Sequence, residues 1–442
     1  MTRFAVTVAF TLVVGGAASA LRAAEPPVNL TEKVATDVRT KSSVELGLKG
    51  ELYFAVEGKK EAVRLEAKAR HAFAERILAV TDGLPSSTAR AYTEAQASVA
   101  VAGDKTARSL PADRRLIVAR RGANGLLCFA PAGPLTRDEL DLVTEHFNPQ
   151  CLAGLLPGKA VSVGDTWTLT DTAAQSACLL GVVLKAEFAG KLAEVKDNVA
   201  TFTIEGKAEG IEHGSKVSLS VTATGTFDIA AGRVTGLVWK QMDEREQGPV
   251  SPASKVEATV TLKREAVAEF PAELSDEAIA KIPEADVPVA MLALRHVDAK
   301  ERYTLVHSRD WHVTGQTDTH LVLRLLDRGE FVAQATVSVW RKTEPGKHMA
   351  VVDFKKAVSE APGWVQTKVL TDGELAMTAG RWLYRLMAEG KMDELQVVQT
   401  FYLLAGPQGD QMGVTVAMKR EQLKVVGNRD LDLVKAIEFG KK

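Results

Sequence analysis

Side chains that commonly bind zinc or copper gather in one stretch of fourteen residues: His307, Asp310, His312, Asp318 and His320. Their spacing fits no standard metal-binding signature. On a single strand, His307 and His312 would also point to opposite faces, because side chains alternate along a strand. We therefore interpret them as solvated turn residues, with metal binding as the alternative, and assign no metal ligand.

The chain has an odd number of cysteines: Cys128, Cys151 and Cys178. Cys128 and Cys178 lie in apolar, strand-like contexts (LLCFA and SACLL), which favour buried cysteines that act as small apolar residues. One disulfide among the three is the alternative in an oxidising compartment. A catalytic thiol is disfavoured because no cysteine has a nearby histidine or a helix-start signature. The sequence leaves the pairing open.

Other catalytic signatures are missing from the sequence. There is no Gly-x-Ser-x-Gly motif, and Gly154–Gly158 (GLLPG) lacks the Lys-Ser/Thr that would make it a phosphate-binding loop. Asp165 and Trp167 (VSVGDTW) could clamp a ligand, but a Gly-Asp turn with an anchoring tryptophan is the favoured interpretation. The sequence thus assigns no catalytic residue, cofactor-binding residue or cofactor.

The bulk composition is that of a globular protein. Of 442 residues, 46% are hydrophobic and 25% charged, and the 55 Lys and Arg balance the 56 Asp and Glu. This balance gives no bias toward nucleic acid or acidic membranes.

The first 20 residues are typical of a secretory signal peptide. Arg3 precedes an apolar run from Phe4 to Val14, and Ala18-Ser19-Ala20 forms a small-x-small cleavage site. The run is shorter than the roughly 20 apolar residues that span a bilayer, although a short membrane anchor is the alternative. We expect a secreted or periplasmic protein with no stable membrane span after cleavage.

Residues 28–264 are predicted to form a β-rich antiparallel domain. Two hairpins are expected, from Leu52–Val56 with Val63–Arg70 and from Arg115–Arg120 with Gly125–Ala130. A helix at about 136–146 begins with a capping box formed by Thr136 and Glu139. Long strands follow, joined by short turns, over residues 182–192, 199–209, 216–229, 233–246 and 256–263.

Such a meander forms either a closed barrel or a curved, half-barrel-like sheet. The open form is favoured because the predicted helix can cover it. The likeness of this region to the half-barrels of periplasmic lipoprotein carriers rests on this strand pattern and on no residue motif.

Residues 265–290 are rich in Pro, Ala and Glu and are predicted to be a linker with one short helix at about 275–282. Residues 291–442 then alternate strands and helices, which indicates a second, α+β domain. A hairpin is expected from 321–326 and 331–340, and another around Glu389-Gly390-Lys391. Residues 364–379 are ambiguous, with helix as the interpretation, and short helices are expected near 420–426 and 429–436.

The second domain resembles the PsbP-like α/β/α sandwich family. The resemblance rests on Tyr303–His307 leading to Asp310-Trp311, on the hairpin and Trp364 segment that follow, on Phe401–Leu404, and on the closing Asp430–Phe439. It covers about a third of the chain and implies a binding or accessory role rather than catalysis. The metal-related role of photosystem members is not implied, because no matching ligands are present.

The fold class expected for the whole chain is therefore α+β: an N-terminal curved antiparallel sheet with a covering helix, then a PsbP-like sandwich. We expect a non-catalytic protein whose partner is an apolar ligand or another protein of the cell envelope, with no nucleic acid. The alternatives are a structural or assembly component, and an envelope hydrolase assembled from scattered residues such as His146, Asp165 and His213.

Overall fold

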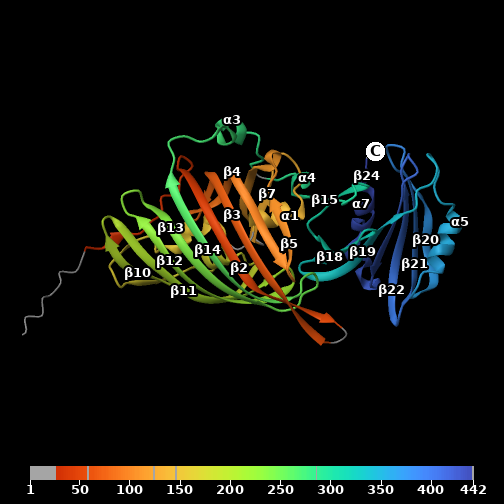
Figure 1. Ribbon diagram of the computed structural model, residues 1–442, viewed down its shortest axis with the longest axis horizontal. Helices are drawn as coiled ribbons and strands as arrows, with labels where there is room; N and C mark the ends of the chain where they lie inside the picture. The colour runs from red at the N-terminus through yellow and green to blue at the C-terminus, as the bar shows by residue number, and fades with distance from the viewer. Residues whose placement is uncertain (1–25, 57–58, 123–124, 145–146, 285, 441–442) are drawn as a thin grey trace, which may run out of the picture.

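The computed structural model describes residues 26–56, 59–122, 125–144, 147–284 and 286–440. The predicted signal peptide and its cleavage site lie outside these residues. The protein is rich in β-structure and is built from several antiparallel sheets. It is elongated, with a large curved sheet at one end and a smaller sheet flanked by helices at the other (Figure 1).

The large sheet contains twelve strands within the described residues. In spatial order they are β7 (Gly125–Phe129), β6 (Leu116–Gly122), β4 (Leu84–Val101), β3 (Lys59–Thr81), β2 (Arg39–Val56), β14 (Ala253–Ala266), β13 (Arg233–Arg245), β12 (Ser215–Asp228), β11 (Val199–Glu212), β10 (Val182–Lys196) and β9 (Thr166–Thr168), with β5 (Asp104–Ser109) beside β4. Both predicted hairpins are present as β2–β3 and β6–β7, and the predicted meander is present as β10 to β14. The hairpin tips at 57–58 and 123–124 lie outside the described residues.

Strict alternation gives this sheet an apolar concave face and a polar convex face. On β12, for example, Val217, Leu219 and Val221 are buried while the residues between them are exposed. Glycines on the concave face make room for rings on the neighbouring strand. A Cβ on Gly225 would collide with the Phe202 ring, so only glycine fits there.

The segment between β7 and β10 packs into the concave face. It contains α1 (Arg137–Thr144), the short 3-10 helix η2 (Pro149–Leu155), α2 (Asp171–Cys178) and β8 (Ala160–Val161), which pairs with β1 (Val28–Asn29). The predicted capping box of α1 is confirmed, since Thr136 N donates to Glu139 Oε2 at 2.8 Å and Glu139 N donates to Thr136 Oγ1 at 3.2 Å. We call residues 131–181 the insert.

The predicted linker is packed against the large sheet. It contains the 3-10 helix η3 (Ala272–Leu274), α3 (Asp276–Ile279) and α4 (Val289–Leu292). Leu274 and Ile282 are buried in a cluster with Ala89, Val118 and Phe129. The segment therefore packs on the face of β4 opposite the insert, so β4 is buried on both faces over residues 87–92. The division of the chain into domains stays a prediction.

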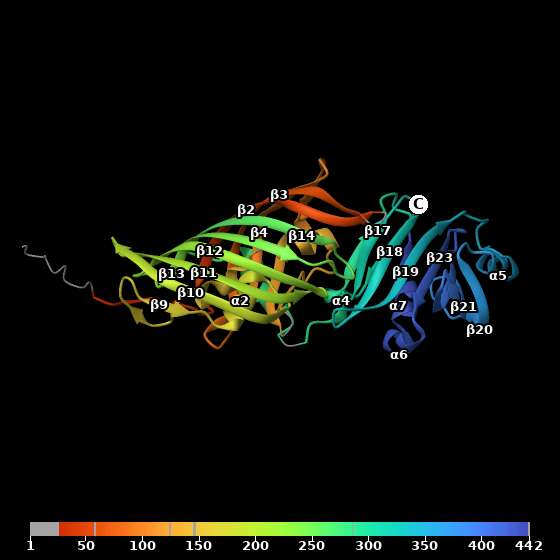
Figure 2. The ribbon, with the colours of Figure 1, turned by 90° about the horizontal axis from the view of Figure 1, so that it is seen from below.

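A seven-stranded antiparallel sheet forms the other end of the molecule. Its order is β17 (Trp311–Gln316), β18 (His320–Asp327), β19 (Glu330–Trp340), β23 (Gln411–Met418), β22 (Leu395–Ala405), β21 (Trp382–Met392) and β20 (Trp364–Leu375). One face packs against α5 (Val351–Ser359), and the other against α6 (Leu423–Val426) and α7 (Arg429–Lys435). A three-stranded sheet of β15 (Leu294–Val297), β16 (Tyr303–His307) and β24 (Ile437–Phe439) lies between the two large sheets, where β15 and β24 are labelled in Figure 1. Figure 2 shows the two large sheets one after the other along the molecule, with α4 near their junction.

Two local predictions in this region are wrong. Residues 364–375 form the edge strand β20 and not a helix, because Val365, Thr367 and Val369 favour extended backbone and β21 supplies a partner. The strand is mostly exposed on both faces, so its sequence lacks the apolar–polar alternation that usually marks a strand. The β21–β22 turn lies at residues 393–394 rather than at Glu389–Lys391. Gly390 stays inside β21, where the Trp364 ring leaves no room for a Cβ.

Candidate binding site

The insert fills most of the concave face with its own side chains. Leu140 and Val143 of α1, Leu152 of η2 and Ala173 of α2 join the core cluster formed by the large sheet. Trp167 belongs to the same cluster, and its Nε1 donates to Leu155 O at 2.9 Å. The concave face is therefore largely a packed core in this conformation.

A charged cluster lies buried between the insert and the sheet. Arg90 on β4 donates from Nε to Glu75 Oε2 on β3 at 2.6 Å and from Nη2 to Asn148 Oδ1 at 2.8 Å. Gln150 of η2 donates to Thr88 Oγ1 at 3.0 Å and to Ala119 O at 2.8 Å. These bonds tie the start of η2 to strands β3, β4 and β6.

The electrostatics of this cluster follow from burial. Burial alone would lower the pKa of Arg90, but the ion pair with Glu75 outweighs it and raises that pKa. Burial raises the pKa of the Tyr92 hydroxyl to about 12 and lowers the pKa of His71 to about 4. A second buried ion pair joins Arg264 on β14 to Glu32. Arg90 therefore stays charged near neutral pH, whereas Tyr92 and His71 stay uncharged.

Two small cavities flank Pro149 at the edge of the insert. One is lined by residues that include His71, Arg90 and Tyr92, and the other by residues that include Glu75 and Arg264. Each has a volume of about 20 Å³, which is room for about one water molecule. Neither cavity can hold an acyl chain in this conformation.

An apolar band continues the concave face beyond the insert. It crosses four adjacent strands, and we define it by its members: Leu48 and Leu52 on β2, Val63, Leu65 and Ala67 on β3, Val99 and Val101 on β4, and Val256 and Ala258 on β14. Directly paired residues share a face, and pairs such as Leu65–Val101 and Leu52–Val63 place the band on the concave side. Leu48, Val256 and Ala258 are buried against their strand neighbours, whereas Leu52, Val63, Leu65, Ala67, Val99 and Val101 stay partly exposed. The band is thus an apolar surface that is only partly buried.

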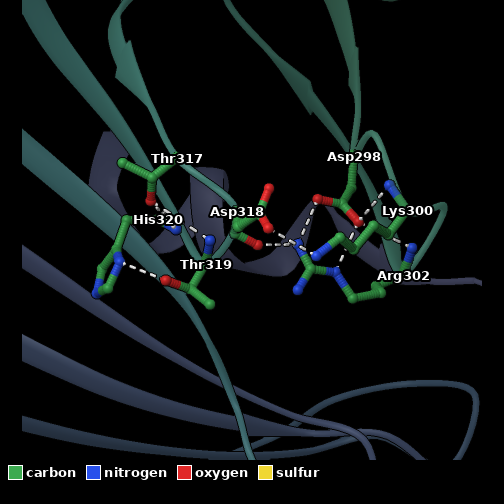
Figure 3. Close-up of polar contacts among 7 residues, drawn as sticks. All are labelled: Asp298, Lys300, Arg302, Thr317, Asp318, Thr319 and His320. Atoms are coloured by element: carbon green, nitrogen blue, oxygen red, sulfur yellow. Dashed lines mark hydrogen bonds and ion pairs between the residues drawn. The ribbon is translucent and has the colours of Figure 1, made fainter.

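The histidine and aspartate side chains between 307 and 320 do not converge. Asp318 pairs with Lys300 and His320 bonds Thr319, as Figure 3 shows. Beside them, Asp298 accepts from Arg302 Nε and Nη2, both at 2.7 Å, and the arginine lowers the pKa of that carboxyl to about 2. This network braces the β15–β16 turn against the β17–β18 turn.

The interpretation of His307 and His312 as solvated turn residues is wrong, because His307 is buried on β16 and His312 is partly buried on β17, a strand of a different sheet. Asp310 lies 3.9 Å from the Arg429 guanidinium. Within the part of the chain that the structure describes, no three or more His, Cys, Asp or Glu side chains are arranged to hold a metal ion.

The residues considered for a hydrolase site have different neighbours in the structure. Asp165 Oδ2 accepts from Ser162 N at 2.8 Å and closes its own turn, as the structural interpretation of the Gly-Asp segment requires. The ring of His213 contacts His312. His146 lies outside the described residues. The three cysteines are free and buried, and burial raises the pKa of each thiol.

Sequence reasoning missed the buried charged cluster. Arg90 lies in a run of small and polar residues (STARAYTEA) whose two faces look alike. Its inward direction follows only from pairing with β3, which places Arg90 beside Glu75. An arginine predicted near the middle of a strand, between two alanines, is the one signal that could have flagged it.

No protein-family profile and no curated protein sequence matches the chain. Among solved structures, cyanobacterial PsbP from Synechocystis sp. PCC 6803 covers 36% of this chain and 96% of its own, with 13% identity and a TM-score of 0.27. The Ran-binding protein Mog1p of Saccharomyces cerevisiae covers 33% of this chain and 95% of its own, with 13% identity and a TM-score of 0.27.

A structure of lipovitellin covers 58% of this chain with 9% identity and a TM-score of 0.31, and this chain spans 29% of its length. PsbP is the family that the C-terminal motifs resemble. Likeness at this level transfers no function. No helix among the described residues is long and apolar enough to cross a membrane.

Proposed function

We propose that this is a non-catalytic binding protein of the cell envelope, and that its ligand is an apolar molecule of the acyl-chain class bound on the concave sheet. The observation that carries the proposal is the apolar band. Its partly exposed members lie on three adjacent strands, β2, β3 and β4, and continue the lining of the core. Contiguous exposed apolar surface of this kind commonly marks an interaction site.

Under this proposal the large sheet acts as a half-barrel, as in the periplasmic lipoprotein carriers that its strand pattern resembles. The ligand lies along the band, at the end of the sheet that the insert leaves uncovered. Export by the N-terminal segment would place the protein among envelope lipids. The second sheet would serve for docking, as an accessory domain.

Titration with a fluorescent fatty acid tests this proposal on the purified chain. Wild type should bind the probe saturably. Leu65→Asp and Val101→Asp should each weaken binding about tenfold or more, because each variant loses apolar contact and places a charge on the band. Both residues are partly exposed, so the sheet should tolerate either substitution.

The matched control is Val238→Asp, which makes the same kind of change on the convex face, where Val238 is 40% exposed. It should bind the probe like wild type. Absence of saturable binding by wild type would refute the acyl-chain ligand, and equal loss in the control would refute the band as the site. If the band binds a protein instead of the probe, and the same two substitutions weaken that binding, the ligand is a protein partner and not an acyl chain.

A further inference from the structure

The two large sheets meet through a contact that contains paired histidines. His213, in the turn between β11 and β12, packs its ring edge-on against His312 of β17, with ring centroids 5.3 Å apart. In the same contact Gly214 lies against the backbone of Gly329, and Arg324 Nη1 donates to Pro249 O at 2.6 Å. We call these residues the turn contact.

A proton on either ring meets mostly positive neighbours. Arg324 is directly opposite His312 on the paired strand β18. Arg137 of α1 and His307 of β16 each disfavour a positive charge on the His312 ring as well. The negative group that faces His213 is Glu212, and its carboxylate pairs with Arg245 of β13. The contact is therefore more stable when both histidines are uncharged.

The rings remain within reach of solvent protons. His213 is exposed over 43% of its side chain, and His312 is partly buried. Burial, assisted by His213 and Arg137, lowers the pKa of His312 to about 3. Partial burial also lowers the pKa of His213, with Glu212 opposing and Arg137 and Arg245 adding to the effect. Buried His307 is a neighbour rather than part of the contact, and its Nδ1 donates to Ser308 O at 2.8 Å.

We propose that the turn contact is a proton-sensitive latch between the two sheets. Uncharged His213 and His312 hold the β11–β12 turn on β17 at neutral pH, and their protonation at mildly acidic pH releases it. The anchor farther along the junction persists, because Arg309 donates to the carbonyls of Leu292 and Cys128, both at 2.6 Å, and these bonds contain no histidine. Release is a local opening and not a separation of the molecule.

The direction of the pH effect follows from the linkage between proton binding and opening of the contact. A histidine whose pKa is lower in the closed contact than in solvent stabilises the contact fully above about pH 6.5, and that stabilisation is lost as the pH falls toward the lowered pKa. At pH 5.0 the medium is about 1.5 units below the solvent value, so His312 alone should favour opening about thirtyfold relative to neutral pH.

Hydrogen exchange of the full chain, corrected for the intrinsic pH dependence, measures this opening. Peptides spanning 210–216 and 326–332 should lose about thirtyfold protection between pH 7.5 and 5.0. Peptides from β22 should keep theirs. Unchanged protection in the contact, or equal loss in β22, overturns the latch.

Two kinds of variant assign the response to the histidine. His312→Phe retains a ring for the edge-on contact and His312→Gln retains polarity, so at least one should fold, and either should lose most of the pH response, since only His213 remains to titrate. His320→Gln, at the exposed first residue of β18, should keep the full response. A folded His312 variant that opens at pH 5.0 as wild type does would refute the role of this residue.

Discussion

We predict that the buried ion pair between Arg90 and Glu75 contributes strongly to the free energy of unfolding only while both partners are present. The two side chains are 2% and 7% exposed, and Asn148 Oδ1 also accepts from the guanidinium. Glu75→Leu would leave the arginine charge buried without a counter-ion. Breaking a buried pair in this way costs about 3–5 kcal/mol of unfolding free energy.

Removing both charges should be far less costly. The double variant Glu75→Leu/Arg90→Met replaces the pair with apolar groups of similar length, a change that is often neutral. Asn148 then loses its bond to the Arg90 guanidinium, which is worth about 1–3 kcal/mol, while its Oδ1 still accepts from Gln150 N at 3.2 Å. We therefore expect the double variant to be more stable than Glu75→Leu alone, and about 1–3 kcal/mol below wild type.

Urea unfolding followed by far-UV circular dichroism measures these differences. The matched control is the exposed pair Lys49–Glu257 of the same sheet, with side chains 72% and 43% exposed. Glu257→Leu should change the unfolding free energy by less than about 1 kcal/mol. A loss for Glu75→Leu no larger than that control, or a double variant worse than the single, would refute the reasoning.

Three further expectations concern the same core. Gly225→Ala should destabilise by about 1–3 kcal/mol in urea unfolding because the new methyl collides with Phe202, whereas Gly47→Ala, with open space around it, should not destabilise. Lowering the pH from 7.0 to 4.5 should cost wild type about 2 kcal/mol more than His71→Phe, because the pKa of His71 is lowered to about 4 and its stabilisation is lost between about pH 6.5 and that value. The native chain should resist alkylation by iodoacetamide at pH 8 and react at three thiols in denaturant, as mass spectrometry would show: Cys128, Cys151 and Cys178.

The sequence predicts structure best where one local rule decides it. Alternation along 199–209 and 216–229 predicts β11 and β12, since one face of each strand is core and the other is wet. Thr136 and Glu139 mark the start of α1 because both capping bonds are local. These elements need no knowledge of distant partners.

The missed features depend on contacts between distant residues. β20 exists because β21 pairs with it, and Gly390 belongs to a strand because Trp364 lies over it. The contact of His213 with His312 joins a turn of one sheet to a strand of another. No spacing along the chain encodes such a pair, and the charged cluster around Arg90 is hidden for the same reason.

The anchoring of the insert decides between two ways in which a ligand could reach the concave sheet. Displacing the insert would break the bonds of Arg90 to Asn148 and of Gln150 to Thr88 and Ala119, and would expose the core of α1, η2 and α2. Bonds to a charged group alone are worth about 1.5–3 kcal/mol, before the lost apolar burial is counted. Binding on the apolar band breaks none of these bonds. Substitutions in the band should therefore alter the affinity for an acyl chain. Asn148→Ala loosens the insert, so it should lower the stability of the protein and leave acyl-chain affinity within about twofold of wild type. A large gain in affinity for that variant would show that the insert must move aside before the ligand binds.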